Sequence, residues 1–417
     1  MDESKLRQLA KTHLLPWFSG ASIDQKSVKS STKDAQVAFV DPCTIAFKAQ
    51  SEDSFRLHLK RSQAFDNLGG GKLAEIDLVK AFVQVVGKMQ GGLNSWYQAD
   101  LASMFPRRVI AKSLCSVKVE EEAFLSVLDQ MSLWAGRQYE GRPIAAAIGF
   151  SRKEFTGGTH FRDICDHDFS AVLSNGFDTM LICDFNGKIC GHEQLKQPPH
   201  PPPFSPNRLQ AIAEWANDGN IAIALNRSGD ILIFRSKELV FARRSGKWHY
   251  LKHSPILTQM GKPSDKIVRQ AVYESALDAS FARTGACIGV VLAANSKKWK
   301  DIATSRADYL SPASSPKGRA IASMVNGVLF QNLDRRLRQE LLAIDGATII
   351  DHKGVILAVG AILKIKGGST GGGRLAAARA LSALGVGIKV SQDGGIRGFH
   401  ETPEDIFDDV TEVFSIM

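Results

Sequence analysis

The sequence from Gly367 to Arg379 reads Gly-Gly-Ser-Thr-Gly-Gly-Gly-Arg-Leu-Ala-Ala-Ala-Arg. Glycine lets backbone amides approach an anion without a Cβ in the way, and the helix that follows would add unpaired N–H donors and a partial positive charge. The pattern indicates a phosphate site that combines these amides with hydroxyl donors and one guanidinium, from Ser369, Thr370, Gly371, Gly372, Gly373 and Arg374. No Gly-Lys-Ser/Thr follows, so the stretch is not a P-loop, and the alternative is a flexible connector with a solvated arginine.

Two other segments of the C-terminal half carry candidate polar residues. The first reads Leu-Ala-Ile-Asp-Gly-Ala-Thr-Ile-Ile from Leu342 to Ile350, and its carboxylate, Asp345, leads into an apolar strand. Such a carboxylate can accept a ribose hydroxyl or help to hold a divalent metal, or it can simply be a turn residue. The second reads Val-Ser-Gln-Asp-Gly-Gly-Ile from Val390 to Ile396, which by itself is also typical of a plain hairpin turn.

Taken together and in this order, the three segments resemble the diadenylate cyclase domain, the domain at the N-terminus of the DNA-integrity scanning protein DisA. The resemblance covers residues 268–399, about a third of the chain, and includes a preceding helix-strand unit over 276–292. It implies an α/β fold and a reaction that joins two ATP molecules into cyclic di-AMP. In that family two domains meet face to face, each holds one nucleotide, and a divalent metal, Mg²⁺ or Mn²⁺, assists.

The resemblance assigns roles to individual residues. Asp345 matches the essential aspartate near the attacking ribose hydroxyl and the metal, and Gly346 and Ala347 complete that motif. The phosphate motif of the family, Gly-Thr-Arg-His-Arg-Ala-Ala, aligns with 372–378, so Arg374 matches its first arginine. The later Ser-Glu-Glu aligns with Ser391, Gln392 and Asp393, which leaves one acidic residue.

Several groups of the family motif are missing. Gly373, Leu375 and Ala376 stand where the motif has threonine, histidine and the second arginine. Each lost charge-assisted contact costs about 1.5–3 kcal/mol, so losing two or three lowers the rate by a factor of about 10³ or more. We therefore expect binding of ATP or cyclic di-AMP with weakened or altered catalysis by Asp345, Arg374 and Asp393. Arg379 can partly compensate, in which case the chain is an active cyclase, and a non-catalytic dimerising scaffold is a third hypothesis.

The rest of the chain predicts an α+β architecture. The segment 197–206 contains six of the fifteen prolines and is expected to be the main inter-domain linker. It would separate an α+β, sensor-like module over 1–196 from a β-meander over 207–262, and a mixed sheet flanked by helices would follow over 263–417. Helical spacing of apolar residues predicts helices over 73–88, 120–134, 264–283 and 320–341. A buried strand is expected over 285–294, and a final pair of strands over 386–390 and 395–399.

Asn186 and Gly187 predict a two-residue hairpin turn in which Cys183 opposes Cys190. Opposed strand residues lie within disulfide range, and Cys165, His167 and His192 offer further metal ligands, although the spacing fits no common zinc pattern. We expect two reduced thiols that pack in a strand pair.

The composition is that of a globular protein with a basic surface. The chain has 52 Lys and Arg against 43 Asp and Glu, a formal net charge of +9, and no long basic block, so charge alone does not indicate a nucleic-acid partner. No apolar run reaches the length of about 18 residues that a membrane span needs, and the first residues are charged. We expect a cytoplasmic protein that self-associates through its cyclase-like domain and does not bind membranes.

Overall fold

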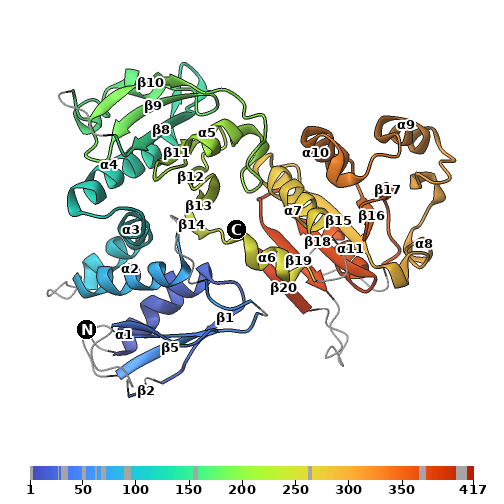
Figure 1. The fold of residues 1–417 in the computed structure, drawn as a ribbon, viewed down its shortest axis with the longest axis horizontal. Helices are drawn as coiled ribbons and strands as arrows, with labels where there is room; N and C mark the ends of the chain where they lie inside the picture. Colours follow the sequence, from blue (N-terminus) through green and yellow to red (C-terminus); the bar gives the residue numbers. More distant parts are fainter. Residues whose placement is uncertain are drawn as a thin grey trace. The chain divides into compact units, whose positions relative to one another are not determined.

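The computed structural model describes residues 3–26, 28–29, 36–48, 53–61, 63–66, 72–88, 95–153, 158–261, 265–365, 372–400 and 411–417. The chain is a mixed α/β protein whose sheets are flanked by helices, as the sequence predicts. It forms two compact units, Met1–Leu251 and Lys252–Met417 (Figure 1). Among the described residues, none of the helices combines the length and the apolar character that a bilayer-spanning segment needs.

The N-terminal unit begins with a small antiparallel sheet of order β1-β5-β4-β3, with β2 paired to β5. Its strands are β1 (Ala21–Ile23), β2 (Val28–Lys29), β3 (Val37–Asp41), β4 (Thr44–Phe47) and β5 (Asp53–Leu59). Three longer helices follow: α2 (Glu75–Lys88), α3 (Ser95–Leu114) and α4 (Lys118–Trp134). Phe47 of β4 and Phe82 of α2 are fully buried and meet edge to face at 6.3 Å, which joins the sheet to the predicted amphipathic helix.

A seven-stranded sheet of order β10-β9-β8-β11-β12-β13-β14 completes this unit. It contains β8 (Ala146–Ser151), β9 (Thr179–Asp184), β10 (Ile189–Gln194), β11 (Ile221–Leu225), β12 (Ile231–Arg235), β13 (Glu238–Arg244) and β14 (Lys247–Tyr250). β11 pairs directly with β8, so strands on both sides of the proline-rich segment share one sheet. The prediction of an inter-domain linker over 197–206 is therefore wrong.

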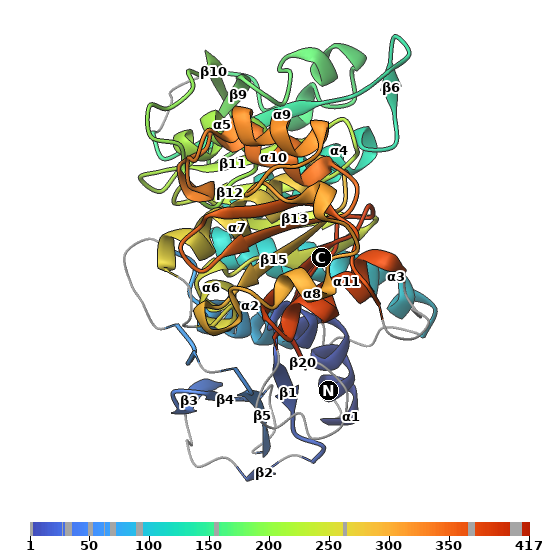
Figure 2. The ribbon, with the colours of Figure 1, turned by 90° about the vertical axis from the view of Figure 1, so that its right-hand side faces the viewer.

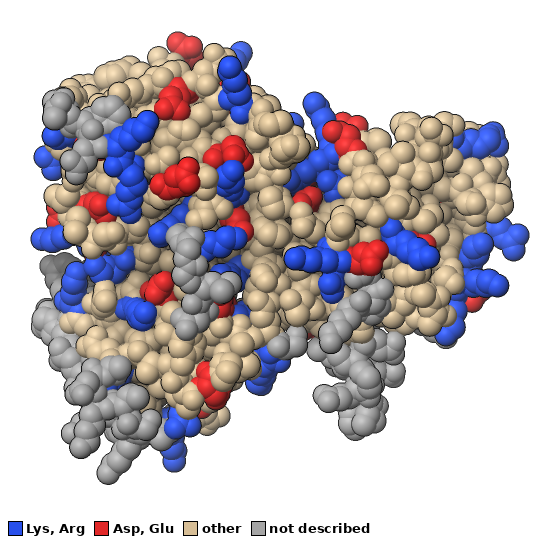
Figure 3. Space-filling view, in the orientation of Figure 1, with Lys and Arg blue, Asp and Glu red and all other residues tan. Residues whose placement is uncertain are grey.

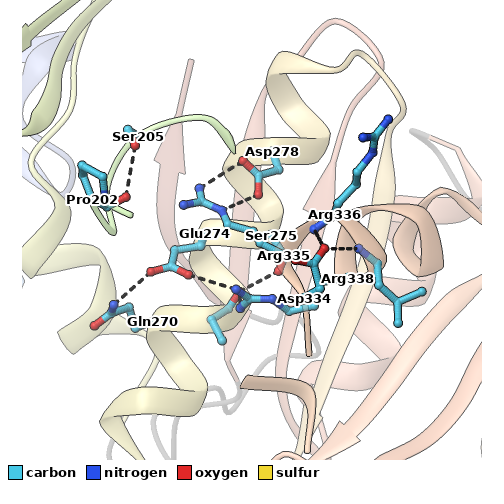
Figure 4. Close-up of polar contacts among 12 residues, drawn as sticks. Pro202, Ser205, Gln270, Glu274, Ser275, Asp278, Asp334, Arg335, Arg336 and Arg338 are labelled. Atoms are coloured by element: carbon cyan, nitrogen blue, oxygen red, sulfur yellow. Dashed lines mark hydrogen bonds and ion pairs between the residues drawn. The ribbon is translucent and has the colours of Figure 1, made fainter. Parts of the chain in front are cut away.

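The proline-rich segment is held within the N-terminal unit by its own hydrogen bonds. The Ser205 hydroxyl is buried and donates to the Pro202 carbonyl at 3.1 Å (Figure 4), and the amide of Leu239 in β13 donates to the Phe204 carbonyl at 2.9 Å. Proline stiffness predicts an extended segment but not what it packs against. The boundary between the units instead follows Leu251.

The β9–β10 hairpin differs from the predicted two-residue turn. The Asp184 carboxylate accepts the amides of Asn186 and Lys188, both at 2.9 Å, and this longer loop shifts the register. Cys183 faces Ile189, and Cys190 lies at the bulge that follows, so the predicted pairing of the two cysteines is wrong. Both thiols are free, and burial raises the pKa of Cys183.

The C-terminal unit contains a six-stranded sheet of order β17-β16-β15-β18-β19-β20 (Figures 1 and 2). Its strands are β15 (Ala286–Val291), β16 (Ala347–Asp351), β17 (Ile356–Ala361), β18 (Gly385–Val390), β19 (Ile396–His400) and β20 (Thr411–Ile416). Its main helices are α6 (His253–Gln259), α7 (Lys266–Phe281), α8 (Trp299–Ile302), α9 (Pro316–Val325), α10 (Arg335–Ala343) and α11 (Gly373–Ser382). The β15–β16 pair is parallel and the other pairs are antiparallel.

Helices cover both faces of this sheet. Leu381 of α11 packs over Gly289 of β15, and the α11 backbone at Ala378 approaches Gly387 of β18, where a Cβ would meet the Ala378 carbonyl. α7 and α10 contact each other and the strands from the opposite face. The helix predicted over 320–341 is two helices, because the chain turns through a left-handed Asn326, with a φ of 44°, and Gly327 between α9 and α10.

Buried ion pairs join α10 to α7 (Figure 4). Arg335 binds the Asp278 carboxylate through two hydrogen bonds, Nε to Oδ2 at 2.7 Å and Nη2 to Oδ1 at 3.0 Å, and the Asp278 side chain is fully buried. Arg338 donates to Glu274 at 3.4 Å and to the Ala271 carbonyl at 3.2 Å. Burial lowers the pKa of Arg338, and the Glu274 carboxylate opposes that shift. These contacts hold the first turns of α10, the helix that leads into β16, on α7.

We expect Arg335→Ala to destabilise the C-terminal unit by about 3–5 kcal/mol, because it removes the bidentate partner of a buried carboxylate. The neighbouring Arg336, whose side chain is 77% exposed, gives the matched control Arg336→Ala, with an expected change within about 0.5 kcal/mol. Hydrogen exchange of the β15 and β16 amides in the full chain measures both. Equal protection in the two variants would contradict this role of the ion pair.

Candidate functional site

The parallel pairing of β15 with β16 brings the three predicted segments to one edge of the C-terminal sheet. Cys287 pairs with Ala347, so Gly285 and Asp345 each stand two residues before the first pair of their strands. The antiparallel neighbours end at this edge, because Val390 of β18 pairs with Ala286 and Ala361 of β17 pairs with Ala347. We call the edge at which β15 and β16 begin, and β17 and β18 end, the site edge.

Asp345 lies in a tight turn between α10 and β16. The following Gly346 has a φ of 106°, and a Cβ there would lie 2.5 Å from the carbonyl carbon of Gly360 and 2.7 Å from its oxygen. Only glycine fits this position without strain. The Asp345 carboxylate is exposed and accepts the Gly346 amide at 3.1 Å, whereas Ala347 is fully buried as the first residue of β16. The turn therefore presents the carboxylate outward on a rigid support.

Arg374, in the first turn of α11, lies against the start of β15. A Cβ at Gly285 would stand 2.8 Å from its Nη1 and 3.2 Å from its Cζ, so glycine at this position makes room for the guanidinium. Burial raises the pKa of the nearby Cys287 thiol to about 12, and the positive charge of Arg374 opposes that shift. Gly285 and Asp345 precede neighbouring strands, which lie about 4.8 Å apart, so Arg374 and Asp345 both lie at the site edge.

The predicted polar turn follows the end of β18 and therefore also lies at the site edge. Ser391 accepts the Gly394 amide through its carbonyl at 2.9 Å and donates its own amide to Gly395 at 2.8 Å, so the segment is a hairpin turn. Ser280 and Arg283 donate to the carbonyls of Gly394 and Asp393, which fixes the turn to the end of α7. The Asp393 side chain is exposed and accepts the Gly395 amide at 3.4 Å.

The glycine-rich loop is described only at its end. Ser369, Thr370 and Gly371 lie outside the described residues. Gly372 and Gly373 are exposed at the start of α11, where Gly372 has a φ of 89°. The predicted alanine-rich helix after the glycines is confirmed as α11.

Arg379 does not join Arg374. Its guanidinium stands 5.9 Å from the centre of the Phe399 ring on β19, whereas Arg374 lies over the start of β15. Five residues turn a helix by about 140°, so the two side chains leave α11 on different sides. Arg379 therefore does not lie beside Arg374, as the expected compensation for the missing second arginine of the motif would require.

Three further cations near these segments were not singled out from the sequence. The Lys317 ammonium donates to the Gly360 carbonyl at 3.2 Å and to Asp308, next to the backbone that packs on Gly346. Lys389 of β18 and Arg397 of β19 lie side by side in the sheet. Strand alternation could have placed Lys389 and Arg397 on one face, whereas only the tertiary fold brings Lys317 to Gly360.

The donor set at the site edge fits a metal ion that phosphates help to hold. The described residues contain no group of three or more His, Cys, Asp or Glu side chains placed to hold a metal. Mg²⁺ is often bound by one or two carboxylates together with substrate phosphates, and the exposed Asp345 suits that arrangement. The chemistry of the described residues therefore allows a metal that arrives with a nucleotide.

Comparisons with known proteins give little beyond this geometry. No family model matches the chain, and no curated protein matches it. Among solved structures, a double mutant of DacA from Staphylococcus aureus, a diadenylate cyclase, is similar at 16% identity over 36% of this chain and 87% of that chain, with a TM-score of 0.23.

We expect Gly346→Ala to destabilise the C-terminal unit by at least about 1–3 kcal/mol, because it combines an unfavourable φ with a clash against the Gly360 backbone. The matched control is Gly373→Ala, where a Cβ meets no atom within 4 Å and alanine favours the helix. Thermal unfolding of the full chain compares the two variants. A Gly346→Ala protein as stable as Gly373→Ala would contradict the close approach of the two turns.

Proposed function

We propose that the C-terminal unit binds an adenine nucleotide, ATP or cyclic di-AMP, at the site edge. The observation that carries the proposal is the convergence of Asp345, Arg374 and the turn at 391–395, three segments far apart in the sequence, on one end of neighbouring strands. Glycine is required at 346, and glycine at 285 leaves space for the Arg374 guanidinium. The resemblance of the same segments to diadenylate cyclase motifs supplies the class of ligand.

Each group has a role that follows from its chemistry. The Arg374 guanidinium presents several donors in one plane and suits phosphate oxygens, and the amides at the start of α11 add donors that carry a partial positive charge. The exposed Asp345 carboxylate accepts a ribose hydroxyl or contributes to a metal that the phosphates bring. A bound Mg²⁺ or Mn²⁺ would neutralise phosphate charge at this carboxylate.

Weakened phosphoryl transfer is part of the proposal. Catalysis of this kind depends on positioning and neutralising the phosphates. The described part of α11 carries two arginines, and only Arg374 lies against the start of β15. The single acidic residue of the later turn, Asp393, bonds its own loop. The set therefore favours binding over efficient synthesis of cyclic di-AMP.

The N-terminal unit would act as the regulatory module, and the C-terminal unit would self-associate as its motifs imply. The N-terminal unit has its own sheets and its own apolar core, so it folds around contacts of its own. Its ligand is not named by any motif in the sequence. A signalling role for the whole chain rests on the nucleotide site alone.

Thermal unfolding with and without ligand tests the binding proposal. ATP or cyclic di-AMP at about 100 times its dissociation constant adds about 2.7 kcal/mol to the free energy of unfolding. We expect Arg374→Ala to abolish this shift and Arg336→Ala, on the exposed side of α10, to retain it.

The reaction products separate the alternatives. The full chain is incubated with ATP and Mg²⁺ or Mn²⁺, and cyclic di-AMP is measured. Efficient formation of cyclic di-AMP would identify a working cyclase and overturn the weakened catalysis. Neither product nor a thermal shift would leave the dimerising scaffold as the remaining hypothesis.

A further inference from the structure

A pair of like charges lies on the α11 face of the C-terminal sheet. Lys389 of β18 is directly opposite Arg397 of β19, and Lys389 is also in register with Cys287 of β15. Like charges directly opposite in a sheet are destabilising. Both side chains are half-buried, so water screens them less than it would on an open surface.

A third cation approaches the same place from the helix. The guanidiniums of Arg379 and Arg397 stand 5.9 Å and 5.4 Å from the centre of the Phe399 ring, which is itself fully buried. Arg397 donates through Nε to Glu412 of β20 at 2.6 Å. We call Arg379, Lys389, Arg397 and Glu412 the β18–β19 cluster.

The charges of the β18–β19 cluster do not balance. It has three cations and one carboxylate, a net charge of 3 − 1 = +2. Among the described residues, the Lys389 ammonium has no hydrogen bond or ion pair. Arg397 donates hydrogen bonds to Glu412 through both Nε and Nη2. Figure 3, which draws one face of the molecule, shows Lys and Arg side chains spread over that face with Asp and Glu side chains among them. An anion from outside the chain would relieve the repulsion within the cluster.

The β18–β19 cluster lies next to the site edge. Lys389 is paired with Cys287, and Cys287 is two residues along β15 from Gly285, against which Arg374 lies. Two residues of a strand span about 6.7 Å, and the neighbouring strand lies about 4.8 Å away. One extended anion can therefore reach both Arg374 and Lys389. Arg374 and the cluster together carry a charge of +3 against this one anion.

We propose that the β18–β19 cluster is a second anion subsite that takes the terminal phosphates of a nucleoside triphosphate held by Arg374. This inference rests on the proposed nucleotide site and names its ligand class more narrowly. A triphosphate carries several contiguous negative charges, whereas each phosphodiester of a cyclic dinucleotide carries one. The subsite therefore selects ATP over AMP and cyclic di-AMP.

Titration calorimetry on the full chain tests the selection, with ATP, AMP, cyclic di-AMP and inorganic tripolyphosphate as ligands. We expect Lys389→Gln to raise the dissociation constant for ATP about 10- to 100-fold, the loss of one charge-assisted contact, and to leave cyclic di-AMP unchanged. The matched control is Lys353→Gln, in the exposed turn after β16 at the opposite end of the sheet. Lys389→Gln should also raise the melting temperature of the ligand-free protein, because it removes the repulsion with Arg397.

The outcomes separate the subsite from the nucleotide site itself. Equal losses for ATP and cyclic di-AMP, or no loss for ATP, would overturn the subsite while the Arg374 site stands. If no nucleotide binds the unaltered chain, the nucleotide proposal fails. In that case tripolyphosphate binding that Lys389→Gln abolishes still supports an anion subsite, and its absence overturns the subsite as well.

Discussion

The parallel pairing of β15 with β16 is the constraint on which the C-terminal unit depends. Parallel neighbours cannot be joined by a tight turn, so the chain between Val291 and Ala347 must return to the edge from which β15 started. It returns through α9 and α10, and the buried contacts of Arg335 with Asp278 hold α10 on α7. A buried ion pair is costly unless its geometry is good, and here two hydrogen bonds hold the start of α10, the helix that precedes β16, on α7.

Glycine, rather than charge, decides how closely the groups at this edge approach one another. The turn at Gly346 stacks on the backbone of Gly360, and the Arg374 guanidinium lies where a side chain at 285 would be. At Gly346 the missing Cβ leaves room for backbone atoms of Gly360, whereas at Gly285 it leaves room for the end of the Arg374 side chain. The turn that carries Asp345 is therefore supported by packed backbone, whereas the place of the Arg374 guanidinium depends on the rotamer of that side chain.

The sequence predicts those parts of the fold that local patterns determine. The apolar residues correctly predict the helix at 75–88 and the strand at 385–390. The helix buries one apolar face and the strand is buried almost throughout, so the local pattern of apolar residues is enough to identify each. The helix expected over 320–341 is interrupted because Asn326 adopts a left-handed conformation, which no spacing rule detects. The proline-rich segment is misassigned because its stiffness is local, whereas its pairing partners lie on strands far away in the sequence. Asp345 and Arg374 were found from motifs, but their shared edge follows from the parallel register, which motifs do not specify.

Positive charge near α11 is arranged differently from the pattern that its motif implies. Where the diadenylate cyclase motif has a second arginine on the helix, this chain has Ala376, while Lys389 and Arg397 lie on strands beneath the same face. The hydrogen-bond ladder of a sheet fixes the backbone of its strands, so the Lys389 and Arg397 side chains start from directly opposite Cα atoms. The repulsion between Lys389 and Arg397 is therefore retained in the folded state, and Glu412 offsets only part of it. The proposed anion subsite gives a reason for such a half-buried pair, because functional sites commonly lower the stability of the protein that carries them.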